Sequence, residues 1–201
     1  MKILVTGGAG YIGSHTVKQL GENGGFDITV FDNLSTGFED SILYGKLVKG
    51  DLSDFEVVRD FLATEKFDAI VHFAASIVVP ESVSNPLKYY LNNTANTSNL
   101  IKAAVDSGVK YFVFSSTAAV YGEPKSDTVT EESETAPINP YGHSKLMSER
   151  VIRDCGFAYD GFKFVILRYF NVAGASMDGR IGQRFPNATH LIKVSCEAAC
   201  G

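Results

Sequence analysis

A tyrosine and a lysine lie four positions apart in the segment NPYGHSKLMSE, residues 139–149. Asn139 and Pro140 are typical of a helix start, because an asparagine side chain caps free N–H groups and proline fits the first helical turn. Tyr141 and Lys145 then share one face of that helix. A lysine ammonium lowers the pKa of a nearby phenol, and a tyrosine tuned in this way can act as a general base near neutral pH. We therefore predict that Tyr141 is the base and that Lys145 tunes it.

Hydroxyl side chains end the strand expected before this helix, in the segment FSSTAAVYG, residues 114–122. Open α/β sheets bind ligands at the carboxyl ends of their strands. Ser116 or Thr117 could therefore hydrogen-bond the same substrate oxygen that Tyr141 deprotonates. Taken alone, a Tyr-x-x-x-Lys pair is more often a surface tyrosine beside a solvated lysine. A dinucleotide-binding loop elsewhere in the chain would reverse that interpretation.

Such a loop follows the first expected strand. Gly7, Gly10 and Gly13 are spaced G-x-x-G-x-x-G, between the apolar run at 2–7 and the helix expected at 11–22. In this pattern one glycine permits a sharp turn, another lets a pyrophosphate approach the main chain, and the last lets helix and strand pack closely. The helix N-terminus adds free N–H groups and a partial positive charge for the anion. The spacing therefore predicts a dinucleotide-binding loop.

Acidic residues end the next two expected strands. Asp32 comes 19 residues after Gly13, at the end of the strand at 27–32. An acid there can accept hydrogen bonds from both hydroxyls of an adenosine ribose and would repel a 2′-phosphate, so NAD is favoured over NADP. The alternative is that Asp32 only caps its strand. Asp51 ends the following strand, where we expect it to meet the adenine amino group.

Short β-rich runs alternate with helical stretches along the chain. Most of the runs are nearly continuously apolar, as in strands buried on both faces of a parallel sheet. The alternation predicts an α/β fold, a doubly wound parallel sheet of the Rossmann type, over residues 1–172. Residues 173–201 are interpreted as the start of a smaller, truncated substrate-binding lobe, with a Gly-, Asn- and Asp-rich loop and then an amphipathic helix. The expected strands are 2–7, 27–32, 46–51, 69–74, 111–116 and 164–172, and the other expected helices are 54–65, 86–107 and 141–157.

Composition narrows the classes of function. A length of 201 residues fits one domain or slightly more, and 45% apolar residues is ordinary for a globular chain. The net charge of −5 without a Lys/Arg cluster argues against a nucleic-acid partner, and the short apolar runs argue against a membrane span. The cysteines, Cys155, Cys196 and Cys200, have no disulfide-type spacing and favour a cytoplasmic location. No metal is expected, because only His190 lies near Cys196 and Cys200.

The motifs together resemble the extended short-chain dehydrogenase/reductases, and among them the UDP-glucose 4-epimerases. The resemblance covers essentially the whole chain and is carried by the segments TGGAGYIGSH, FDNLSTG, GDLSD, HFAAS, ESVSNPLKYYLNN, FSSTAAVYG, PINPYGHSKLMSE and LRYFNVAGA. In that family NAD stays bound through turnover. The tyrosine removes the proton of the sugar 4-hydroxyl while hydride leaves C4, the 4-keto sugar turns over in the site, and hydride returns to its opposite face.

The resemblance therefore implies C4 epimerisation of UDP-glucose and UDP-galactose, with Tyr141, Lys145 and Thr117 as catalytic residues. It implies a homodimer that pairs through the helices at 86–107 and 141–157. It assigns Thr117, Tyr141 and Asn171 to the UDP-sugar. The residues it assigns to NAD are Gly7, Gly10, Tyr11, Ile12, Gly13, Asp32, Asn33, Ser35, Asp51, Leu52, Phe73, Ala74, Ala75, Asn92, Ser115, Tyr141, Lys145 and Phe170.

Some features depart from the family pattern. Thr117 stands where the family commonly has serine, but it keeps the hydroxyl. Ala118 and Ala119 stand where the related 4,6-dehydratases carry an Asp-Glu pair, so no group remains to move the C5 and C6 protons of a sugar. The family chain is considerably longer, so this chain is interpreted as a fragment or truncated form in which cofactor binding survives better than substrate binding.

Two other functions stay open. One is a non-catalytic NAD-binding regulatory module, against which the retention of Thr117, Tyr141 and Lys145 argues. The other is a 4-epimerase of the same family that acts on N-acetylated or uronic acid sugars.

Overall fold

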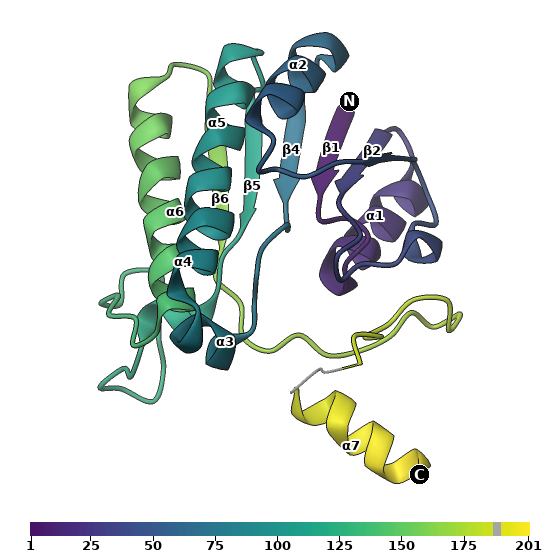
Figure 1. Cartoon of the computed structure of the whole chain (residues 1–201), viewed down its shortest axis with the longest axis vertical. Helices are drawn as coiled ribbons and strands as arrows, with labels where there is room; N and C mark the ends of the chain where they lie inside the picture. Colours follow the sequence, from purple (N-terminus) through teal and green to yellow (C-terminus); the bar gives the residue numbers. More distant parts are fainter. Residues whose placement is uncertain (187–189) are drawn as a thin grey trace.

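The structure is a computed structural model that describes residues 1–186 and 190–201. Within these ranges, six parallel strands form one sheet in the order β3-β2-β1-β4-β5-β6 (Figure 1). This order defines a doubly wound Rossmann sheet, so the predicted fold class is confirmed. The strands are β1 (Lys2–Thr6), β2 (Asp27–Asp32), β3 (Lys46–Lys49), β4 (Ala69–His72), β5 (Tyr111–Ser115) and β6 (Lys163–Leu167).

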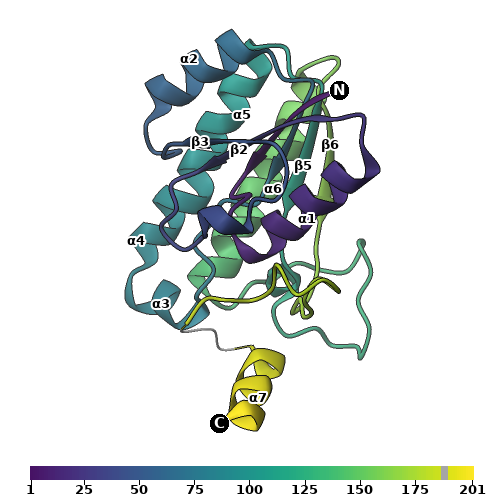
Figure 2. The ribbon, with the colours of Figure 1, turned by 90° about the vertical axis from the view of Figure 1, so that its right-hand side faces the viewer.

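Helices cover the two faces of the sheet unequally. The helices α2 (Phe55–Glu65), α5 (Asn96–Asp106) and α6 (Pro140–Ala158) lie on one face, and α1 (Tyr11–Asn23) lies on the other (Figures 1 and 2). Side chains of each strand alternate between the two cores, as the pleat requires. Leu4 belongs to the larger core under α2, α5 and α6, whereas its neighbours Ile3 and Val5 belong to the smaller core under α1.

The helix expected at 86–107 is not regular. It begins as α4 (Pro86–Tyr89), passes through a π-helical turn, η2 (Tyr90–Ala95), and continues as α5. Turns of this kind are often found at functional sites. A short helix that the sequence pattern did not predict, α3 (Val79–Ser84), precedes it. The Asn93 side chain of the π-helical turn accepts a bond from the Ser76 main-chain N–H and donates one to the Ser76 carbonyl, 2.8 and 2.9 Å away, so it fixes the loop after β4.

β2 has the predicted bounds, but the other strands end earlier than expected, and the difference is largest at β6. The chain still makes sheet-like bonds beyond Leu167, since the Ala118 N–H donates to the Tyr169 carbonyl at 2.9 Å. After that point it leaves the sheet and runs past the carboxyl ends of the strands toward α1 (Figure 1). The Tyr11 hydroxyl holds it there by a 2.6 Å bond to the Gly174 carbonyl.

The amphipathic helix expected near the end of the chain is present as α7 (Leu191–Cys200), and none of its residues is buried. Figure 1 shows it apart from the sheet. Short 3-10 turns, η1 (Glu39–Ser41) and η3 (Ala118–Tyr121), complete the described elements. In the described part of the chain, no helix has both the length and the apolar character needed to cross a membrane.

Candidate functional site

The glycine loop between β1 and α1 has no room for side chains at two of its positions. Gly7 has φ +71°, and a Cβ there would lie 2.5 Å from the main-chain nitrogen of Ala74. A Cβ at Gly13 would lie 2.2 Å from the Gly7 carbonyl oxygen. The loop therefore packs directly against the segment after β4, where the sequence placed Phe73, Ala74 and Ala75.

The N-terminus of α1 is free to receive an anion. Gly10 is the N-cap residue, no side chain caps the helix, and its first turn carries no acidic residue. The main-chain N–H groups of such a turn and the helix dipole suit a pyrophosphate. The predicted contacts Tyr11 and Ile12 lie in this turn, so the residues present fit a dinucleotide.

Asp32 is buried at the end of β2 and ties two loops together. Its Oδ2 accepts a bond from the Ala9 N–H, and its Oδ1 accepts one from the Leu34 N–H, each at 2.9 Å. A carboxylate has further acceptor sites beyond these two bonds. Asp32 thus has a structural role in the glycine loop beside the role predicted for it at a ribose.

The residues expected around adenosine lie together beyond β2 and β3. The Asn33 amide donates to Asp51 Oδ2 at 2.7 Å, and the Ser35 N–H donates to Asn33 Oδ1 at 3.0 Å. The bond from Asn33, followed by those from Ser53, lowers the pKa of Asp51 below its ordinary value. Leu52 is buried beside them.

Tyr141 and Lys145 lie in the first two turns of α6. Asn139 caps this helix through a 2.9 Å bond from the Gly142 N–H, and Pro140 is its first residue, as predicted. The Tyr141 ring packs edge-on against Tyr89, with 6.3 Å between ring centroids. The helix start therefore places the phenol beside the helical segment that leads into η2.

The electrostatics of this pair differ from the sequence-based prediction. Burial raises the pKa of Tyr141, the nearby Thr117 hydroxyl lowers it in part, and Tyr169 raises it further. The net shift of the Tyr141 pKa is therefore upward, opposite to the direction predicted from Lys145, because burial is the largest effect. Lys145 Nζ itself donates to the Ser115 carbonyl at 2.9 Å and lies 4.8 Å from the centroid of the Phe114 ring.

Lys145 is itself strongly affected by its surroundings. Its side chain is buried, and burial lowers its pKa to about 7, although Glu149 counteracts part of the shift. A lysine with this pKa changes its protonation state near neutral pH, whereas an exposed lysine stays protonated there.

The structure separates the two hydroxyls that the sequence left open. Ser116 is buried and donates to Glu149 Oε1, so its hydroxyl is already engaged by another side chain. Thr117 lies near Tyr141 and also accepts a 3.1 Å bond from the Ala119 N–H. Thr117 is therefore the hydroxyl that accompanies the tyrosine.

The other predicted residues lie in the loop after β4, at the end of β5 and on the segment after β6. The Asn92 amide donates to Ser76 Oγ at 3.1 Å in the loop after β4, and the Ser115 hydroxyl bonds the Tyr169 hydroxyl. Phe170 and Asn171 are exposed on the segment after β6, and Phe170 is 70% exposed. Both residues are therefore largely open to solvent in this chain.

Sequence reasoning missed Asn93, Glu149 and Arg168, all of which bond to segments of the site. Glu149 accepts bonds from Ser116 and Arg168, and Asn93 also donates to Ser144 Oγ at 3.1 Å. Glu149 had a usable signal, because it follows Lys145 by one further helical turn on the same face. Arg168 had none, since its partner lies on another element.

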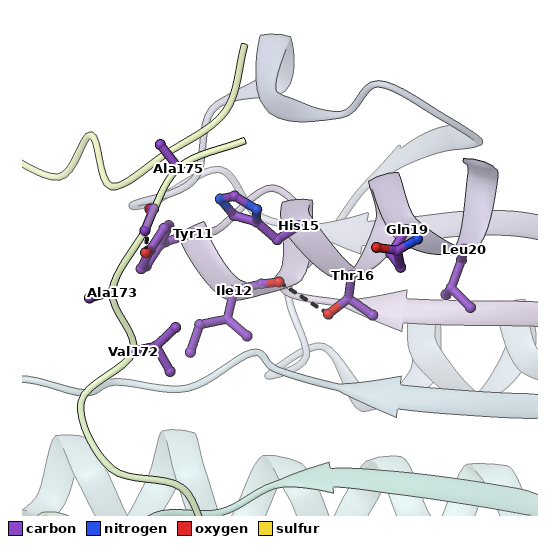
Figure 3. Close-up of a pocket in the computed structure, with 10 residues that line it drawn as sticks. Tyr11, Ile12, His15, Thr16, Gln19, Leu20, Val172, Ala173 and Ala175 are labelled. Atoms are coloured by element: carbon purple, nitrogen blue, oxygen red, sulfur yellow. Dashed lines mark hydrogen bonds between the residues drawn. The ribbon is translucent and has the colours of Figure 1, made fainter. Parts of the chain in front are cut away.

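A cavity of about 460 Å³ lies between the outer side of α1 and the segment after β6. Figure 3 shows Tyr11, Ile12 and His15 on one side of it and Val172 and Ala173 on the other. The cavity therefore lies beside the N-terminal turn of α1, and neither Tyr141 nor Thr117 lines it.

The cysteines of α7, Cys196 and Cys200, are exposed thiols. Residues 1–186 and 190–201 contain no cluster of three or more His, Cys, Asp or Glu side chains arranged to hold a metal.

Comparisons with known proteins identify the family. Residues 3–195 match the model of the NAD dependent epimerase/dehydratase family. The chain is 53% identical, over its whole length, to 57% of the UDP-glucose 4-epimerase of Azospirillum brasilense. It matches the structure of the Brucella ovis UDP-glucose 4-epimerase in complex with NAD at a TM-score of 0.95 and 42% identity, covering 100% of this chain and 61% of that one. The UDP-Glc/GlcNAc 4-epimerase of Campylobacter jejuni matches at a TM-score of 0.88 and 58% identity, covering 100% and 62%.

The chain belongs to the NAD dependent epimerase/dehydratase family. NAD is the cofactor of this family, and the glycine loop, Asp32 and the free N-terminus of α1 are suited to it. The chain spans 57% to 62% of the length of the three relatives named above.

Proposed function

We propose that this chain is the NAD-binding part of an enzyme that inverts C4 of a UDP-hexose, converting UDP-glucose and UDP-galactose into each other. The observation that carries the proposal is that Tyr141 and Lys145 lie at the start of α6, with Lys145 bonded to the Ser115 carbonyl at the end of β5, while Thr117 follows that strand at the carboxyl edge of the sheet. A non-catalytic NAD-binding module would have no need of these three groups. The relatives named above, all 4-epimerases, support the same conclusion.

The proposed chemistry assigns one task to each side chain. When bound, NAD supplies a reversible hydride acceptor. Tyr141 takes the proton of the sugar 4-hydroxyl as a general base and later returns it. Thr117 hydrogen-bonds the same oxygen, and Lys145 binds the nicotinamide ribose. Asn171 and Phe170, which are exposed in this chain, contact the sugar nucleotide and the nicotinamide.

A second substrate class has direct support. The relative that is 58% identical to this chain is named for both UDP-Glc and UDP-GlcNAc. We therefore propose the N-acetylated UDP-hexoses as the alternative substrates. The two classes differ at C2 of the sugar and not at C4, so the catalytic residues are the same for both.

Three further proposals concern organisation. Residues 1–172 form the NAD-binding domain, and 173–201 begin a substrate-binding lobe. The protein is a homodimer that pairs through α6 and the helical segment formed by α4, η2 and α5, where Leu87, Leu91 and Met147 are exposed. The cysteines are free thiols, which supports a cytoplasmic location.

The proposed function is tested on the complete natural protein. Purified protein is denatured to release bound dinucleotide, and NAD is identified in the supernatant. UDP-galactose and UDP-N-acetylgalactosamine are then offered separately, and the products are followed by proton NMR of the sugar. We expect bound NAD and conversion at C4. Protein that retains NAD but converts neither sugar would contradict the proposal.

A further inference from the structure

A buried ion pair joins α6 to the segment that follows β6. Arg168 donates to both oxygens of the Glu149 carboxylate, from Nε to Oε1 at 2.9 Å and from Nη2 to Oε2 at 2.6 Å. The side chains are 1% exposed at Glu149 and 10% exposed at Arg168. Two parallel bonds fix the planes of both groups relative to each other, which a single bond would not do.

The same carboxylate holds the segment that carries Thr117. The Ser116 hydroxyl donates to Glu149 Oε1. The main chain on either side of Thr117 is bonded to the continuation of β6, through Ser116 N–H to Leu167 and Ala118 N–H to Tyr169, each at 2.9 Å. Thr117 is thus fixed to the β6 continuation through the main chain and to α6 through one side-chain bond.

Glu149 lies on the helix that also carries the predicted base. It follows Lys145 by four residues and Tyr141 by eight, so its carboxylate connects the Thr117 segment to the helix of Tyr141. Arg168 in turn packs over the Tyr121 ring, 4.9 Å from the centroid, which limits its movement. Buried ion pairs are weak contributors to stability compared with apolar side chains of similar volume. Their fixed geometry is the property that apolar packing would not reproduce.

We propose that Glu149, acting through Ser116 and Arg168, is a positioning residue that sets the Thr117 hydroxyl against the Tyr141 phenol. This inference rests on the proposed function, because the placement of that hydroxyl affects a rate only if Tyr141 moves a substrate proton. Glu149 itself is buried behind the site and acts only through its neighbours.

Ser116→Ala is the first test, since it removes the side-chain link and leaves the ion pair intact. In the complete protein we expect kcat for UDP-galactose conversion to fall about 10-fold, less than the roughly 10² to 10⁴ expected for loss of the acid–base group itself, while KM and the melting temperature stay close to wild type. A crystal structure of the variant should show the Thr117 side chain displaced from Tyr141. Thr29→Val is the matched control, because it also removes a buried sheet hydroxyl, one without a hydrogen-bond partner among the described residues. It should keep wild-type turnover.

A double-mutant cycle separates positioning from general damage. In the Thr117→Val background, Ser116→Ala should cost almost nothing further, because the hydroxyl that it positions is already gone. The combined variant Glu149→Met with Arg168→Met removes the ion pair without leaving either partner as a lone buried charge. It also removes the Glu149 charge that acts on Lys145, so kcat is compared at about pH 9, where Lys145 is neutral. It should lower kcat by a similar factor, and Ser116→Ala should then add nothing.

Wild-type kcat in Ser116→Ala, or in the folded Glu149→Met, Arg168→Met variant, would overturn the inference. Additive losses from Ser116→Ala and Thr117→Val would overturn it as well, and so would an unmoved Thr117 in the crystal structure. These outcomes are all measured against an active wild-type protein. An inactive wild-type protein with bound NAD would instead count against the proposed function.

Discussion

Lys145 on α6 donates its hydrogen bond to the main-chain carbonyl of Ser115, 2.9 Å away at the end of β5. The lysine is therefore placed by the fold, through an acceptor that no side-chain substitution at Ser115 removes. It is also buried over an aromatic ring, and we expect that burial to make the stability of the protein depend on pH.

Lys145→Met should change how stability depends on pH. The folded-state pKa of Lys145 is about 7, below the ordinary 10.5, so the folded protein binds fewer protons than the unfolded chain between these values. At high pH the lysine is neutral in both states. As pH falls toward 7, only the unfolded chain takes up the proton, so the folded protein loses stability relative to it. When pH is lowered from 10 to 7, urea titrations should therefore show that the wild-type protein loses a few kcal/mol of unfolding free energy relative to the Lys145→Met variant. The exposed Lys102→Met serves as control, and a shift as large in that variant would refute the assignment to burial.

Tyr141→Phe should abolish most turnover without unfolding the protein. The ring and its packing against Tyr89 remain, but the proton acceptor is lost, so kcat should fall by a factor of roughly 10² to 10⁴. Thr117→Val should also slow the reaction, whereas Thr117→Ser should keep most of it because the hydroxyl is retained. Turnover of UDP-galactose and a melting curve are recorded for each variant. Near-normal turnover of a folded Tyr141→Phe protein would show that another group is the base.

Asp32→Asn should weaken the preference for NAD over NADP. The amide keeps acceptor capacity for the Ala9 or Leu34 N–H but loses the charge that repels a 2′-phosphate. Titration of both dinucleotides into dinucleotide-free protein should give much tighter NAD binding in wild type and a smaller ratio in the variant. Equal affinity of the wild-type protein for NAD and NADP would overturn the role assigned to Asp32.

Two glycine substitutions should have separable effects. Gly13→Ala places a Cβ 2.2 Å from the Gly7 carbonyl oxygen, so the loop must distort and the melting temperature should fall by several degrees. A Cβ added at Gly10 would have only the Gly7 carbonyl oxygen near it, at 3.3 Å, and would otherwise occupy the open side of the loop. Gly10→Ala should therefore retain stability and lose NAD affinity, as calorimetric titration would measure. Equal losses of stability in both variants would contradict the proposal that the pyrophosphate binds on the open side of the loop at Gly10.

Leu91→Glu should convert the proposed homodimer into a monomer. Leu91 is 63% exposed on the segment expected to pair with the partner, and a buried unpaired carboxylate at such an interface is costly. Light scattering of the complete protein should give half the wild-type mass. Val57→Glu, on the outer side of α2, is the control and should remain a dimer. A wild-type protein that is monomeric at micromolar concentration would exclude the proposal outright.

The parts of the fold that the sequence predicted correctly depend on short spacings. The glycine loop, Asp32 and the start of α6 each follow from residues within one strand-to-helix unit, where local backbone rules apply. The bonds from Arg168 to Glu149 and from Asn93 to Ser76 join separate elements, and no local pattern encodes them. The direction of the Tyr141 pKa shift was mispredicted for a similar reason, since the burial that raises it comes from the packing of separate elements.

The unequal helical cover of the sheet has a consequence for the behaviour of residues 1–201 in concentrated solution. β6 is an edge strand, and Val165 and Leu167 are 52% and 42% exposed on the face that α6 does not cover. An edge with unpaired main-chain groups and apolar neighbours is a template for pairing with a second strand. Preparations of this polypeptide on its own should accordingly form sheet-rich aggregates as concentration rises, and a lysine at Val165 should delay their onset.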